Sequence, residues 1–426
     1  MHKNLRRDSK WGLLAVLLVW TLLAALPVAA QQPIRIGVVT FLSGGAAGPF
    51  GVPAKQGGEL ITEALNAGGK VPGYGVKGLG GAPIELVVVD EAGGTTKQVT
   101  EFRNLAQRVD VIIGYISSGD CLAVAPIAEE LKKLTILFDC GTPRIFEDAS
   151  YKYVFRTGAT STMDNVAAAL YIAETKPTIQ KISGINQNYA WGQDSWNDFI
   201  AAMKVLKPGV QVGTVQWPQL MAGQYGAEIS ALLSSGADVV HCSFWGGDME
   251  AFVLQGSPRG LFKKSTVVLT AGETGMQKLG NQVPDGTIIE ARGPFDMFAP
   301  DTELNRWFRK AYMDKYGVPP TYPSYKMAQA ILGLKSAWEK GKAKNAADVP
   351  KVIAAFENLT FEAPGGKVRM SLGKGHQAVQ GMVVGTVKHD GGKVTYANVK
   401  QYPAEKVTPP EGVKAEDWIK SGFKKQ

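Results

Sequence analysis

The chain has 426 residues, 45% of them hydrophobic and 20% charged, which indicates a globular protein with room for two domains. Removal of residues 1–30, an expected leader, lowers the net charge from +8 to +5, with 42 basic against 37 acidic residues. An excess this small and dispersed argues against a nucleic-acid partner.

Residues 1–30 have the composition of a secretory signal peptide. Four basic residues precede an apolar run over residues 11–26, and small residues follow at positions 28 and 30. This order predicts cleavage near Ala30, a mature N-terminus at Gln31 and a location in the periplasm. An uncleaved membrane anchor is the alternative, and the Arg6-Arg7 pair leaves Sec and twin-arginine export open.

From residue 34 the chain alternates strand and helix patterns, which predicts a doubly wound α/β architecture in two series. The first series has expected strands at residues 34–40, 84–90, 111–113 and 134–138, with helices at 53–66, 95–108 and 121–131. The second has strands at residues 181–185, 210–216, 238–242, 266–269 and 287–290, with a helix at residues 160–174, one that ends at residue 206 and one that ends near residue 234. Helices at residues 301–316, 322–340 and 349–358 follow, and then a β-hairpin from residues 381–387 and 392–396.

The loops after these strands are the candidate site, because ligands of such folds bind outside the carboxyl ends of the strands. After the third strand, a polar loop at residues 117–120 leads into a helix, where free amides and the helix dipole favour an anion. A plain turn, with Ser118 or Asp120 capping the helix, is the alternative.

The loops supply three kinds of side chain. Hydroxyls and amides suit a carboxylate, an acid suits an ammonium group, and aromatic walls suit an apolar side chain or a ring. Core packing is the alternative for each aromatic residue. The candidates are Phe50, Ser117, Ser118, Cys140, Thr142, Tyr189, Trp191, Phe244, Trp245 and Glu273.

No catalytic or cofactor motif is present in the sequence. The spacings of a dinucleotide fingerprint, a P-loop, a G-x-S-x-G elbow and a metal site are all absent. We therefore expect neither an enzyme nor a cofactor. The three cysteines, Cys121, Cys140 and Cys242, are expected as free buried thiols, with pairing of the first two left open.

Eight segments in a fixed order carry a family resemblance over almost all of residues 31–426. They are Ile34-Arg-Ile-Gly-Val38, Asn66-Ala-Gly-Gly69, Glu85-Leu-Val-Val-Val-Asp90, Asp110-Val-Ile-Ile-Gly114, Phe155-Arg-Thr157, Tyr189-Ala-Trp-Gly192, Tyr316-Gly-Val-Pro-Pro320 and Gly375-His-Gln-Ala-Val-Gln-Gly-Met382. In this order they resemble the type I periplasmic binding proteins of ABC importers, in the branched-chain amino acid group.

The resemblance implies two doubly wound lobes that close on a ligand about three crossings, near residues 155–158, 290–294 and 358–364. Lobe 1 is expected to contain residues 31–157 and 293–357, and lobe 2 residues 158–292 and 358–426. By the same resemblance, Ser118 and Thr142 hold the ligand carboxylate and Glu273 takes its ammonium group. Main-chain contact from Cys140 and walls of Phe50, Trp191 and Trp245 complete the implied site.

The implied function is capture of a branched-chain or other apolar amino acid by a monomeric protein that docks on the permease subunits of an ABC importer. Tryptophans stand where tyrosines are common, which raises an aromatic carboxylate as an alternative ligand. An amide- or urea-type ligand and a ligand-sensing role are further alternatives. Gly93 and Ser117 occupy the positions of a disulfide found in some members of the family.

Overall fold

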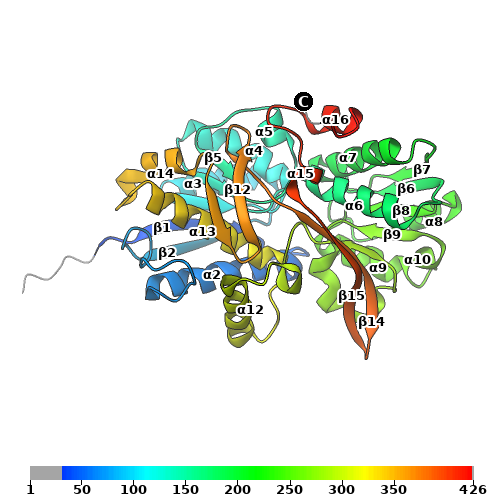
Figure 1. The fold of residues 1–426 in the computed structure, drawn as a ribbon, viewed down its shortest axis with the longest axis horizontal. Helices are drawn as coiled ribbons and strands as arrows, with labels where there is room; N and C mark the ends of the chain where they lie inside the picture. Colours follow the sequence, from blue (N-terminus) through cyan, green and yellow to red (C-terminus); the bar gives the residue numbers. More distant parts are fainter. Residues whose placement is uncertain (1–30, 425–426) are drawn as a thin grey trace, which may run out of the picture. The chain divides into compact units, whose positions relative to one another are not determined.

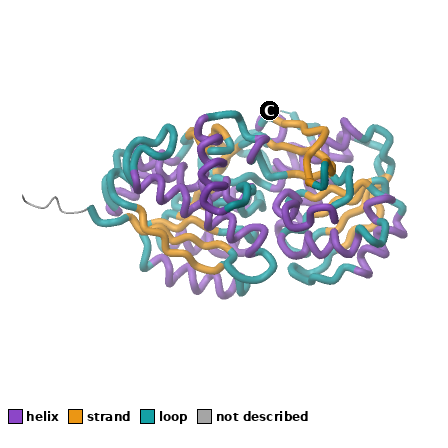
Figure 2. The backbone as a smooth tube through the Cα atoms, turned by 90° about the horizontal axis from the view of Figure 1, so that it is seen from below, coloured by secondary structure: helices purple, strands orange, loops and turns teal. Residues whose placement is uncertain are grey.

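A computed structural model of the chain describes residues 31–424, so the expected signal peptide lies outside the described residues. Residues 33–424 form one compact unit that contains two β-sheets. Helices flank the strands of each sheet (Figures 1 and 2). We refer to the eight-stranded sheet with its helices as lobe 1, and to the seven-stranded sheet with its helices as lobe 2.

The sheet of lobe 1 contains the four strands expected for the first series. Its β3 strand (Val111–Gly114) is buried along its whole length, as expected for a parallel strand covered on both faces. The order across the sheet is β11 (Thr360–Ala363), β12 (Gly366–Leu372), β13 (Gln377–Val379), β5 (Val154–Arg156), β4 (Thr135–Leu137), β3 (Val111–Gly114), β1 (Ile34–Thr40) and β2 (Ile84–Asp90).

The sheet of lobe 2 contains the five strands expected for the second series, which confirms the doubly wound architecture. Its order is β15 (Lys393–Tyr402), β14 (Met382–Asp390), β10 (Ile288–Glu290), β9 (Thr266–Leu269), β8 (Val239–Cys242), β6 (Lys181–Ile185) and β7 (Gln211–Gln216). The predicted hairpin is present as the antiparallel pair β14 and β15. Its turn uses Gly391 and Gly392 with φ of 55° and 80°, a backbone region that favours glycine.

Each lobe takes its helices from two separate stretches of the chain. Lobe 1 holds α2 (Val52–Ala67), α3 (Thr95–Ala106), α4 (Ser118–Glu130), α5 (Arg144–Glu147), α12 (Glu303–Tyr316), α13 (Tyr322–Lys340) and α14 (Val349–Phe356). Lobe 2 holds α6 (Ser161–Thr175), α7 (Ala190–Leu206), α8 (Gly226–Ser235), α9 (Gly246–Gly256), α10 (Leu261–Lys264), α11 (Met276–Leu279), α15 (Ala404–Val407) and α16 (Ala415–Lys420). Within residues 31–424, no helix combines the length and apolar character that a membrane span requires.

The third crossing differs from the prediction. Strands β11, β12 and β13 belong to the sheet of lobe 1, so the expected passage into lobe 2 near residues 358–364 is wrong. The reason is pairing: β13 lies parallel to β5, with Gln377 opposite Arg156, and β12 and β11 add to its free edge. The chain therefore makes its third crossing, from lobe 1 into lobe 2, between Val379 and Met382.

Candidate functional site

A small cavity lies between the lobes at the carboxyl ends of their parallel strands. Its empty volume is about 240 Å³. This is the position expected for a ligand of a doubly wound sheet. The lining residues are Phe50, Ile116, Gly141, Tyr189, Trp191, Trp245, Ala271, Arg292 and Tyr322.

Five aromatic side chains line this cavity. The ring of Phe50 makes edge contacts with Trp245 and Tyr322, at centroid distances of 5.4 and 5.8 Å. The Trp245 indole N–H donates to the Tyr189 hydroxyl at 2.7 Å, and the Trp191 indole donates to a main-chain carbonyl at 2.8 Å. The structure thus brings together four of the predicted aromatic residues and adds Tyr322, which the sequence did not single out.

Phe244 is not part of this cavity. Its ring packs in the core of lobe 2 against Tyr225 and Phe252, at centroid distances of 4.7 and 5.7 Å. Core packing, the alternative weighed for every aromatic candidate, is therefore the role of this residue.

The predicted hydroxyl groups lie near the cavity but bind other protein groups. The Ser117 side chain caps α4 by accepting from the amide of Asp120, so the expected caps at Ser118 or Asp120 are wrong. The Ser118 hydroxyl accepts from the amides of Gly141 and Thr142, each at 3.2 Å. The Thr142 hydroxyl donates to Asp194 at 2.6 Å. None of these three hydroxyls lines the cavity.

The anion-binding end of α4 is occupied by a side chain of the protein itself. Both carboxylate oxygens of Glu91 accept from the Ile116 amide, at 2.8 and 2.9 Å, and one accepts from the Ser117 amide at 2.7 Å. Burial and the nearby Asp120 raise the pKa of the Glu91 carboxyl. The sequence signal that could have identified Glu91 is its position directly after the expected strand at residues 84–90.

Cys121 and Cys140 form a disulfide, with their Cα atoms 6.5 Å apart. The preference for free buried thiols at these two positions was therefore wrong, whereas Cys242 is free and buried. The bond joins the first turn of α4 to the loop after β4. This is the same loop that Ser118 holds through two amides, so the Cys140 main chain is fixed in place beside the cavity.

Glu273 lies outside the interlobe cavity. Its carboxylate accepts from the amide of Tyr322 at 3.1 Å, at the start of α13. It faces a different cavity, lined in part by Phe295, Asp296 and Tyr396. Burial raises the pKa of the Glu273 carboxyl to about 8. In this structure Glu273 therefore binds a helix terminus and contributes no charge to the aromatic cavity.

Arg292 is the charged residue of the cavity, and sequence reasoning missed it. It lies in the crossing after β10, and its guanidinium carbon stands 4.6 Å from the centroid of the Trp191 ring. Its Nη1 donates to Asp139 of lobe 1 at 2.8 Å, and its Nε donates to Asp164 of lobe 2 at 3.1 Å. The guanidinium therefore links both lobes beside the cavity. The Tyr322 hydroxyl also donates to Asp139.

Two further contacts hold the lobes together near the cavity. Asp194 of α7 accepts from Arg144 Nε at 2.9 Å in addition to the Thr142 hydroxyl. Gly141 lies so close to lobe 2 that an added Cβ would stand 2.3 Å from the Trp191 ring.

Across residues 31–424, no cluster of three or more His, Cys, Asp or Glu side chains is placed to hold a metal ion.

A protein-family model described as periplasmic binding protein matches residues 33–393. Among curated sequences, a Leu/Ile/Val-binding protein homolog 4 from Brucella melitensis is 24% identical, over 91% of this chain and 93% of that protein.

Solved structures share the fold. A solute binding protein of an ABC transporter from R. palustris, in complex with benzoate, has a TM-score of 0.77 and 22% identity, covering 90% of this chain and 99% of that one. A leucine binding protein from Thermotoga maritima has a TM-score of 0.71 and 20% identity, covering 86% of this chain and 98% of that one.

Proposed function

The chain belongs to the periplasmic binding protein family, and from this premise we propose that it captures a small aromatic carboxylate between its lobes. The bound protein then docks on the membrane permease subunits of an ABC importer. The observation that carries the choice of ligand is the lining of the interlobe cavity, which combines five aromatic rings with one guanidinium and includes no acidic side chain.

Each part of the cavity suits one part of such a ligand. The rings of Phe50, Trp191 and Trp245 offer edge and face contacts to an aromatic ring. Arg292 already pairs with Asp139 and Asp164, so its charge is largely compensated. Its Nη2 donates to the carbonyl of Ala159 at 3.0 Å, which leaves the second hydrogen of Nη2 to donate to a ligand carboxylate. The Tyr189 hydroxyl already accepts from Trp245, which leaves its own hydrogen free to donate to a ligand oxygen.

The interlobe cavity is small, which favours a ligand with a single ring over a larger one. The R. palustris structure in complex with benzoate, and another from R. palustris in complex with 4-hydroxybenzoate, support the same ligand class.

A branched-chain amino acid is the second candidate. The Brucella relative and the Thermotoga maritima leucine binding protein favour it. An amino acid, however, needs an anionic partner for its ammonium group. Glu273 is the acid that the family resemblance offers, yet it lies on another cavity, and its raised pKa of about 8 keeps much of it uncharged at neutral pH.

Calorimetric titration of the purified protein with benzoate and with leucine separates the two candidates. We expect benzoate to bind and Trp245→Ala to weaken it by about tenfold or more, since one aromatic contact is worth about 0.5–1.5 kcal/mol beyond the area it buries. Trp217→Ala, which removes an exposed indole, is the matched control and should leave binding unchanged. Binding of leucine without benzoate would reject the aromatic carboxylate in favour of the amino acid.

We also propose that the protein acts as a monomer in the periplasm after loss of residues 1–30. Family membership and the composition of the leader support this location. Mass spectrometry of the exported protein should find Gln31 at its N-terminus, and retention of the leader in the exported protein would count against cleavage.

A further inference from the structure

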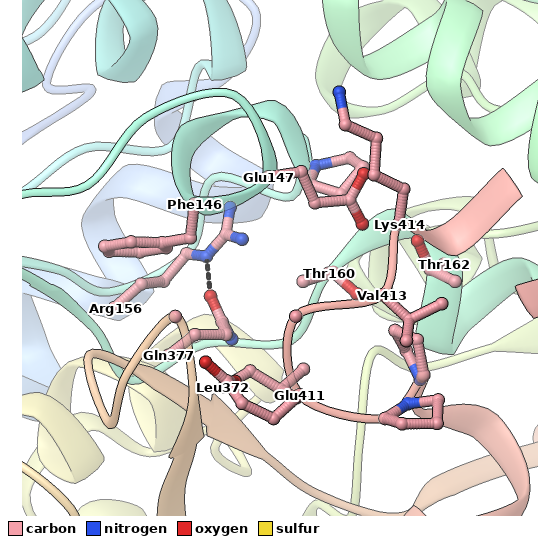
Figure 3. A pocket seen from close by; sticks show the side chains of 15 residues that line it. Phe146, Glu147, Arg156, Thr160, Thr162, Leu372, Gln377, Glu411, Val413 and Lys414 are labelled. Atoms are coloured by element: carbon pink, nitrogen blue, oxygen red, sulfur yellow. Dashed lines mark hydrogen bonds between the residues drawn. The ribbon is translucent and has the colours of Figure 1, made fainter. Parts of the chain in front are cut away.

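A second cavity lies beneath the C-terminal segment and shares no lining residue with the aromatic cavity. Its empty volume is about 580 Å³. Its walls come from lobe 1, from the start of α6 in lobe 2, and from residues 409–414, which cover it (Figure 3). The side chains that carry the argument are Phe146, Glu147, Arg156, Thr160, Thr162 and Leu372.

Arg156 is a fully buried cation that forms no direct ion pair with a described residue, and the nearby Glu147 carboxyl acts on it only through space. Its Nε donates to Gln377, and its Nη1 donates to the carbonyls of Cys140 and Thr142 at 3.1 and 2.6 Å. Among the described residues, Nη2 donates to no acceptor, and no ion pair within 4.0 Å includes Arg156. Figure 3 shows the guanidinium between Phe146 and Gln377, directed toward the middle of the cavity.

Burying a charged guanidinium is unfavourable unless an anion or a hydrogen-bond acceptor contacts each of its N–H donors. Burial and the nearby Arg292 lower the pKa of Arg156 to about 9, which leaves the guanidinium charged at neutral pH. Three protein acceptors satisfy two of its nitrogens. The third nitrogen therefore offers a charged donor to whatever occupies the cavity.

The N-terminus of α6 opens into the same cavity. Thr160 is the N-cap of this 15-residue helix, and both Thr160 and Thr162 line the cavity. The amide of Thr162 lies in the first turn, where no carbonyl of the helix can accept from it. The positive end of the helix dipole adds to the field of Arg156, and both favour a negative charge.

The acidic residues in the lining already have partners. Glu147 accepts from the Ala415 amide at 2.9 Å, and Glu411 accepts from the Lys374 amide at 2.7 Å. Lys414 is paired with Asp148 outside the cavity at 2.7 Å. These carboxyl groups still limit the total negative charge that the cavity accepts, so one negative charge on the occupant fits better than two.

We propose that this cavity is a second binding site, for a small monoanion that accepts from Arg156 Nη2 and from the first turn of α6. The apolar walls of Phe146, Leu372 and Val413 and the volume of the cavity favour a short-chain organic monocarboxylate over an inorganic ion. The inference is independent of the aromatic ligand proposed for the interlobe cavity.

Calorimetric titration of the purified protein with sodium propionate, at low ionic strength, tests the proposal. Propionate should bind, and Arg156→Gln should weaken it by about ten- to a hundredfold, through loss of a charge-assisted hydrogen bond. Because Arg156→Gln removes a buried group and can impair folding, Leu372→Trp is the second variant. It fills the cavity from β12 and should abolish propionate binding while leaving Arg156 in place.

Trp245→Ala separates this site from the interlobe cavity, since it should leave propionate binding unchanged. A parallel titration with sodium bromide identifies the occupant. Bromide binding that both Arg156→Gln and Leu372→Trp weaken, without propionate binding, supports the site with an inorganic monoanion. Absence of binding for both anions, or propionate binding that Leu372→Trp leaves intact, would overturn the proposal and leave Arg156 as a support for the Cys140–Thr142 loop alone.

Discussion

Loss of the Cys121–Cys140 disulfide should destabilise the protein and loosen one wall of the interlobe cavity. The bond joins residues separated by 19 positions, and it ties α4 to the loop that carries Gly141. Reduction removes this link, while the Ser118 hydroxyl continues to hold the amides of Gly141 and Thr142. The perturbation therefore acts on one defined loop.

The chain-entropy model relates the stabilisation by a disulfide to the length of the loop it closes. For a separation of 19 residues it predicts about 3 kcal/mol at 25 °C. The entropy of unfolding of globular proteins, about 2.1 cal/mol/K per residue, converts this to a fall in Tm of about 4 °C for a chain of this length.

Urea unfolding with and without a reducing agent measures this difference. The double variant Cys121→Ala/Cys140→Ala is the matched control, because its stability should not respond to the reductant. Cys242 stays a free thiol in both proteins, and burial raises its pKa, which keeps it unreactive. If reduction changes the free energy of unfolding of the wild-type protein by less than about 1 kcal/mol, the loop-closure reasoning fails.

Three more predictions concern the contacts between the lobes. Gly141→Ala would place a Cβ 2.3 Å from the Trp191 ring, and we expect the benzoate Kd to rise about 5- to 150-fold, the equivalent of about 1–3 kcal/mol of overpacking, in calorimetric titrations. Asp194→Asn removes the charge that pairs with Arg144, whose side chain is 39% exposed, and should lower the free energy of urea unfolding by only about 1 kcal/mol, a difference that high salt should reduce. Burial raises the pKa of Glu273 to about 8, so its contribution to stability is full below the unfolded pKa of about 4.3 and is lost as the pH rises through 8. Glu273→Gln should therefore gain stability relative to wild type between pH 5 and pH 8 in thermal unfolding scans, and parallel pH profiles for the two proteins would refute this.

The strand–helix alternation was readable from the sequence because it depends on local patterns. A short apolar run such as residues 111–113 predicts a buried parallel strand, and the structure has β3 there. The same patterns located the loops at the carboxyl ends of the strands. Aromatic residues in those loops, such as Trp191 and Trp245, could thus be expected at the site before any contact was known.

The partners of the polar side chains could not be read in the same way. Glu91 accepts from amides 25 and 26 positions away, and Arg292 reaches Asp164 across 128 positions. Such pairs depend on strand register and on how the two lobes meet, and no local periodicity encodes either. The family resemblance assigned Ser118 and Glu273 to a ligand, whereas in this structure both bind backbone amides.

The sequence by itself determined the two-series α/β architecture, the hairpin near the C-terminus and the aromatic character of the interlobe cavity, because hydrophobic periodicity and turn residues act over short distances. Only the tertiary structure decided where the cavity obtains its charge, that Cys121 and Cys140 pair, and that β11 to β13 extend lobe 1. The physical reason is that a buried charge or an open sheet edge must be satisfied by whichever group folding brings to it. For Arg156 that requirement points to a ligand, since its Nη2 has no acceptor within the described residues.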